Sequence, residues 1–160
     1  MNKLEELEKK YKELGEEIER LKGKSVERWR AEYEGEYWFL DDSGDIIEED
    51  DSDWSCDCYR YQIGNYFKTK EEALKYSDKI LIYNRLKDLA LKYNKGEKLD
   101  WSNGNQKKFY IYFDNQAKRL EYAYHSTYKD IGAIYCIDPE FLETAMDEIG
   151  EEDLMKLFEE

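Results

Sequence analysis

The sequence TKEEALKYSDKILIYNRLKDLALKYNKG, residues 69–96, combines a helix start, an apolar stripe and a helix stop. Thr69 and Glu72 have the spacing of a capping box, in which side chains bond the free N–H groups of the first helical turn. The stop is the run Asn94-Lys95-Gly96. The pattern predicts a helix over residues 70–93, with an apolar stripe at Ala73, Tyr76, Ile80, Tyr83, Leu86, Leu89, Ala90 and Tyr93.

On the N-terminal side of this helix, apolar residues alternate with polar ones, as is typical of strands. The alternation predicts one long or bulged strand over residues 29–39 and a hairpin turn at 41–44. A short strand around Ile46 and Ile47 and an acidic loop over 48–57 follow. Residues 59–63 are predicted as a third strand.

On the C-terminal side, residues 108–113 and 120–124 alternate around a turn and predict a second hairpin. Residues 134–137 predict another short strand. Asp138 then suits a helix N-cap with Pro139 at the first helical position, and Gly150 interrupts the helix that follows.

The first 22 residues carry apolar side chains at alternating spacings of three and four, which is the a/d pattern of a coiled-coil seam. Gly23 is a predicted C-terminal stop. Three heptads are marginal as an isolated helix, so the arm is expected to pack on another copy, on the domain or on a partner. The candidate oligomerisation residues are Leu4, Leu7, Tyr11, Leu14, Ile18 and Leu21.

Together these patterns predict an α+β fold, with an N-terminal coiled-coil-like helix followed by a small antiparallel sheet packed with two to three helices. The expected division is a helical arm over residues 1–23 and an α+β domain over residues 24–160. Within that domain, residues 41–57 form an acidic loop and residues 139–160 form acidic C-terminal helices.

The net charge of −14 is concentrated in those two segments, because residues 41–57 carry nine acids and no base and residues 139–160 carry nine acids and one base. Such a charge repels nucleic-acid phosphates and favours solubility or a basic protein partner. Neither a signal peptide nor a membrane-spanning apolar run is evident, and three cysteines including a Cys-x-Cys pair suit free thiols. We therefore expect a cytoplasmic protein.

No motif predicts chemistry, so the chain is expected to be a binding protein without cofactor, metal or catalytic residues. The one histidine, His125, lies in a tyrosine-rich strand. Cys56 and Cys58 lack the second pair typical of structural zinc sites, and an EF-hand begun at Asp41 would need Gly in place of Ile46. The glycines form no phosphate-binding loop.

Rows of carboxylates on a folded surface can imitate duplex phosphates and bind a Lys- and Arg-lined channel. An exposed aromatic residue such as Trp54 could anchor the contact. The alternative is that the acids provide only solubility. The predicted partner-binding residues are Asp41, Asp42, Asp45, Glu48, Glu49, Asp50, Asp51, Asp53, Trp54, Glu140, Glu143, Asp147 and Glu148.

Several stretches of the chain carry a family resemblance: Trp29, residues 37–39, Gly44, Arg60, residues 64–73, 132–135 and 149–152, and Leu154. In these the chain resembles uncharacterised proteins from phages and mobile elements of low-GC Gram-positive bacteria. Small acidic proteins of such elements are often inhibitors of host defence, including anti-CRISPR proteins. The resemblance implies no catalytic residue.

The resulting hypothesis is an anti-CRISPR protein that acts as a DNA mimic. It would bind the basic nucleic-acid channel of a CRISPR effector in the host cytoplasm, without binding nucleic acid or membranes itself. The alternative hypothesis is an oligomeric accessory or structural interaction protein that forms a homodimer through its N-terminal helix.

Overall fold

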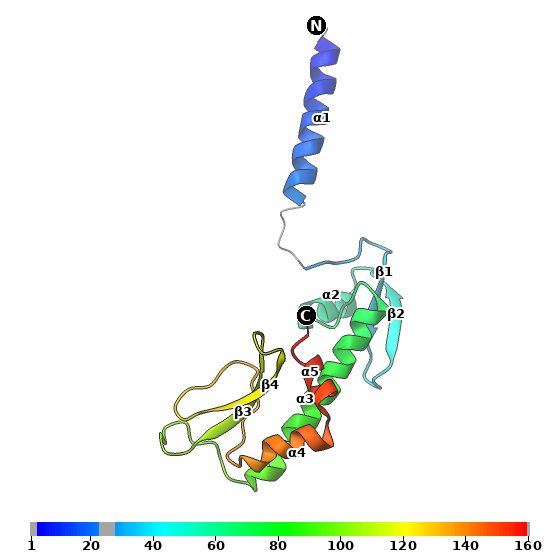
Figure 1. The fold of residues 1–160 in the computed structure, drawn as a ribbon. Coiled ribbons are helices and arrows are strands. Elements are labelled where there is room, and N and C mark those ends of the chain that lie inside the picture. The colour runs from blue at the N-terminus through cyan, green and yellow to red at the C-terminus, as the bar shows by residue number, and fades with distance from the viewer. Residues whose placement is uncertain (1–2, 23–27, 160) are drawn as a thin grey trace.

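The computed structural model describes residues 3–22 and 28–159, except for the side chains of residues 4–6, 8 and 19–22 (Figure 1). The predicted α+β class is confirmed. In chain order the elements are α1 Lys3–Lys22, β1 Glu36–Leu40, β2 Ile46–Asp50, α2 Ser55–Ile63, α3 Lys70–Asn94, β3 Lys108–Asp114, β4 Arg119–His125, α4 Glu140–Glu148 and α5 Glu151–Lys156.

Helix α3 is the long central element, and its predicted bounds are confirmed to within one residue. The first half of the predicted capping box is confirmed, because the Thr69 hydroxyl accepts from the Glu72 N–H. The Glu72 carboxylate accepts from the N–H of Lys68, one residue before the N-cap, rather than from Thr69. The β1–β2 hairpin packs on α3, as do α4 and α5. Figure 1 shows α3 running from the first hairpin toward the region where β3, β4 and α4 lie.

The strands form two separate two-stranded antiparallel sheets, so the prediction of one sheet is wrong. Tyr37 lies opposite Glu49 in the first sheet, and Phe109 lies opposite Tyr124 in the second. The predicted hairpin over residues 108–124 is confirmed. Two short hairpins can each bury one face against a helix without extending one another.

The predicted long strand over residues 29–39 is wrong in its first half. A turn precedes β1, in which the Gly35 N–H donates to the Glu32 carbonyl and Glu34 has a φ of +62°. A residue with positive φ cannot continue a strand, so the alternation through Trp29, Ala31 and Tyr33 does not produce one. Only Glu36–Leu40 pairs with β2.

The predicted third strand over residues 59–63 is helix α2 instead. Asp57 accepts a hydrogen bond from the Trp54 N–H three residues earlier, and Gly64 ends the helix with a φ of +85°. The acidic segment is therefore not a loop, because residues 48–50 belong to β2 and residues 55–57 to α2.

Near the C-terminus, the predicted strand at 134–137 is reduced to a single bridge between Cys136 and Phe109. Helix α4 begins at Glu140, one residue later than predicted, and the Asp138 carboxylate accepts from the Glu140 N–H. Gly150, with a φ of +94°, separates α4 from α5, so the predicted interruption is confirmed.

The described part of the domain has two apolar cores. The smaller one contains Tyr37, Phe39 and Tyr66 beneath the first hairpin. The larger one joins the second half of α3 to β4, α4 and α5, and its buried members are Ile82, Leu86, Leu89, Ala90, Leu120, Cys136, Phe141, Leu142, Ala145, Ile149 and Leu154. Among the described helices, none is long and apolar enough to cross a membrane.

Helix α1 is present over residues 3–22, and Figure 1 shows it extending away from the rest of the chain. Its side chains at Leu7, Tyr11, Leu14 and Ile18 are exposed. The predicted stop at Gly23 and the side chains of Leu4 and Leu21 lie outside the described residues.

Candidate functional site

Half of the eight acids predicted in the first segment are engaged within the chain. Asp41 closes the hairpin turn by accepting from the N–H groups of Ser43 and Asp45. The other engaged acids are Glu49, which pairs with Arg60, and Asp51 and Asp53, which both pair with Arg30. Asp42, Asp45, Glu48 and Asp50 are exposed, and no ion pair to a described basic side chain involves them.

Asp51 is a buried structural carboxylate, with an exposed fraction of 1%. The Arg30 guanidinium binds it through two hydrogen bonds of 2.8 and 3.1 Å, and the Tyr66 hydroxyl donates a third of 2.7 Å. These bonds, led by those from Arg30, lower the pKa of Asp51 to about 2 even though burial opposes the shift. Burial and the neighbouring Asp51 charge raise the pKa of Tyr66.

Asp57 forms a second buried network through Tyr37, whose ring stacks on the Tyr66 ring with centroids 3.9 Å apart. The Tyr37 hydroxyl donates to Asp57 at 2.8 Å and accepts from Arg60 at 2.6 Å. Burial raises the pKa of Tyr37, so its hydroxyl remains a donor to Asp57. The Arg60 guanidinium also lies 3.5 Å from the Phe39 ring centroid.

These two networks change the electrostatics predicted for residues 41–57. Arg30 precedes this segment in the sequence and Arg60 follows it. Both arginines nevertheless form ion pairs with carboxylates inside the segment. The repulsion among the nine acids of this segment is therefore partly relieved inside the chain. The acids that form no ion pair with a described basic side chain lie on the hairpin turn and β2.

The acids of the second segment lie on the solvent side of α4. Glu140, Glu143, Asp147 and Glu148 are exposed, while Phe141, Leu142 and Ala145 between them face the core. Glu148 lies 3.7 Å from the Lys92 ammonium of α3. Trp54, the predicted aromatic anchor, is 71% exposed at the start of α2.

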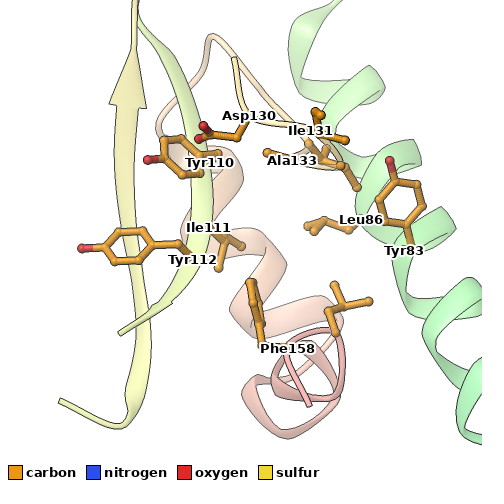
Figure 2. A pocket seen from close by; sticks show the side chains of 12 residues that line it. Tyr83, Leu86, Tyr110, Ile111, Tyr112, Asp130, Ile131, Ala133 and Phe158 are labelled. Atoms are coloured by element: carbon orange, nitrogen blue, oxygen red, sulfur yellow. The ribbon is translucent and has the colours of Figure 1, made fainter. Parts of the chain in front are cut away.

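An open cavity of about 370 Å³ lies between α3 and β3, and residues 130–134 and 157–158 complete its lining. Figure 2 shows Leu86 of α3 and Ile111 of β3 pointing into it, with Phe158 below them. The phenol oxygens of Tyr110 and Tyr112 point away to the other side of β3. The cavity is therefore mainly apolar and could hold an apolar group.

Asp130 is the one carboxylate among the residues that line this cavity. It lies at the rim in Figure 2, with its Oδ2 atom 3.3 Å from Nε2 of His125. The His125 ring lies between the rings of Tyr110 and Tyr128. In the described part of the chain, no serine or cysteine is hydrogen-bonded to His125.

Sequence reasoning missed Lys108, whose side chain is completely buried. Its ammonium donates to the carbonyl oxygens of Asp100, Asn103 and Ser126, and it lies 5.2 Å from the Trp101 ring centroid. The ammonium thereby joins the connection between α3 and β3 to the end of β4. A lysine at the first position of a strand gives no signal of burial in the sequence alone.

The three cysteines are free thiols, of which Cys56 is exposed and Cys136 is buried. Cys56 and Cys58 lie on helix α2, whereas the sequence predicted a loop over residues 48–57 and a strand from residue 59. Across residues 3–22 and 28–159, no group of three or more His, Cys, Asp or Glu side chains is arranged to hold a metal ion.

Three comparisons with known proteins bear on identity. No family model, no curated protein and no solved structure matches this chain.

Proposed function

We propose that this chain is a non-catalytic inhibitor that occupies a basic nucleic-acid channel of another protein. The most concrete form is a phage-encoded anti-CRISPR protein that acts as a DNA mimic against an effector nuclease. It would work in the cytoplasm of the bacterial host, and it would bind neither nucleic acid nor membranes directly.

The observation that carries the proposal is the exposure, on ordered elements, of carboxylates that form no ion pair with a basic side chain the structure describes. On the first hairpin these are Asp42, Asp45, Glu48 and Asp50, and on α4 they are Glu140, Glu143 and Asp147. A strand rises about 3.3 Å per residue, so Glu48 and Asp50 lie on one face about 7 Å apart. Fixed anionic charges at such intervals favour fast association with a basic groove.

The cavity between α3 and β3 favours binding over catalysis. Its lining is mainly apolar, and Asp130 contributes its single carboxylate.

The proposal predicts that neutralising the free hairpin acids will weaken inhibition of an effector nuclease by at least about tenfold, because the long-range attraction to the channel is lost. The test variant combines Asp42→Asn, Asp45→Asn, Glu48→Gln and Asp50→Asn. DNA cleavage by a panel of purified CRISPR effector nucleases would be measured against inhibitor concentration. The measurement would be repeated at about 50 and about 200 mM salt, where phosphate-like contacts weaken steeply.

A control with the same change in net charge separates a local surface from total charge. It combines Glu71→Gln, Asp78→Asn, Asp88→Asn and Glu97→Gln, all at exposed positions on or after α3. We expect this control to inhibit like the parent chain. Equal inhibition by both variants, or no inhibition of any effector by the parent chain, would contradict the proposal.

The second candidate function is an oligomeric accessory or structural interaction protein of a phage or mobile element. The observation that favours it is the exposed apolar stripe on α1. In that case the acids provide solubility and the helix provides assembly. Deleting residues 1–22 distinguishes the two, since this candidate loses its assembly and its activity together, whereas the inhibitor keeps an intact acidic surface.

A further inference from the structure

Helix α1 carries an apolar face that nothing else in the described chain covers. Leu7, Tyr11, Leu14 and Ile18 are 57%, 83%, 62% and 49% exposed, and they follow one another at spacings of four, three and four. Figure 1 shows α1 standing away from the remaining elements. An isolated helix of this length is marginal in water, so a stable α1 requires a partner for this face.

The residue types at the heptad positions of α1 favour a parallel pair of helices. With Leu4 assigned to position a of the heptad, Leu7, Leu14 and Leu21 occupy position d, and Tyr11 and Ile18 occupy the next two a positions. At Ile18 the β-branched residue at a beside leucine at d is the combination that favours a parallel two-stranded coiled coil.

The charged residues beside the a and d positions also agree with a parallel pair in which each residue lies opposite the same residue of the other copy. In such a pair, each g position faces the e position five residues later in the other chain. Lys3 at g is followed by an acid at position 8, and Glu17 at g is followed by a base at position 22.

We propose that α1 pairs in parallel and in register with α1 of a second copy of this chain. The two domains over residues 28–159 then lie at the same end of the paired α1 helices. The dimer therefore presents two copies of any binding surface to one target. This arrangement does not depend on what the domains bind. If each domain binds a target site, two linked sites raise the apparent affinity without any new contact.

The first test measures mass by sedimentation equilibrium at about 10 to 100 µM chain, a range suited to a short and weak coiled coil. We expect the full chain to approach twice the mass of one copy. The double variant Leu7→Ala, Leu14→Ala should lose at least about tenfold in association, because it removes two seam layers while keeping good helix formers. The matched control Lys12→Ala, Glu16→Ala changes the outer face and should pair like the parent.

Salt separates this pairing from binding to a basic partner. An apolar seam should hold or strengthen as salt rises, because salt screens the repulsion between two acidic domains. A parent chain that stays monomeric over the whole concentration range overturns the proposal, as does a Leu7→Ala, Leu14→Ala variant that pairs as tightly as the parent.

The second test reads orientation by disulfide cross-linking in a Cys56→Ser, Cys58→Ser background, which removes the two accessible thiols. In a parallel pair, Leu14→Cys meets itself and cross-links rapidly under mild oxidation. In an antiparallel pair, Leu7→Cys of one chain meets Ile18→Cys of the other. Cross-linking of Leu14→Cys alone supports the proposal, and preferential cross-linking between Leu7→Cys and Ile18→Cys chains overturns it.

Discussion

Asp51→Asn is expected to lower the free energy of unfolding by about 3 kcal/mol, because it removes one charge from a buried ion pair. Asp51 is 1% exposed and receives two bonds from Arg30 and one from the Tyr66 hydroxyl. An asparagine amide can accept only part of these bonds and leaves the Arg30 charge poorly compensated. Urea unfolding followed by circular dichroism at pH 7 measures the change.

Asp53→Asn is the matched control, because Asp53 binds the same guanidinium at 2.8 Å but its side chain is 65% exposed. An exposed ion pair contributes less than about 1 kcal/mol, so this variant should unfold almost like the parent. Equal losses for Asp51→Asn and Asp53→Asn would show that burial of Asp51 does not determine the stability of the first hairpin.

The same carboxylate predicts a response to acid. Its pKa in the folded chain is about 2, against 3.8 in an unperturbed aspartate, so the folded state favours the ionised form. The corresponding stabilisation of about 2 kcal/mol is present above the unfolded pKa and is lost as the pH falls toward about 2. The stability difference between the parent and Asp51→Asn should therefore shrink between pH 5 and pH 2, by roughly that amount.

Lys108→Met is the second substitution with a large expected effect, a loss of about 3 kcal/mol in the free energy of unfolding. Methionine has a similar length and keeps the apolar stem, but it donates nothing to the carbonyls of Asp100, Asn103 and Ser126. Three acceptors in a partly buried place are then left without their donor. Denaturant unfolding measures the loss, and hydrogen exchange of residues 97–107 should increase.

Lys107→Met is the control for Lys108→Met, since the neighbouring lysine is exposed and lies over the Tyr124 ring. It removes the same charge from the adjacent position and should change the free energy of unfolding by less than about 1 kcal/mol. Similar stability of the two variants would mean that the three carbonyl bonds of Lys108 are replaced by water at little cost.

Patterns of a few adjacent residues, such as caps and alternations, correctly predicted the elements that form through contacts between neighbouring residues. The N-cap at Thr69 defined the start of α3, and the alternation over 108–124 with its turn defined the β3–β4 hairpin. The same kind of alternation failed at residues 59–63, where Asp57 and Gly64 supply helix caps that the apolar pattern does not include. Capping bonds outweigh a short alternation because they satisfy backbone groups directly.

Local sequence patterns were enough to predict the α+β class, the long central helix, the second hairpin, the interruption at Gly150 and the two acidic segments. Which acids form ion pairs depends on the folded chain, because Arg30 and Asp51 are 21 residues apart and no local pattern pairs them. The tertiary structure also decided the burial of Lys108 and the separation of the sheets. Local propensity acts over a few residues, whereas charge pairing and burial depend on which distant segments fold together.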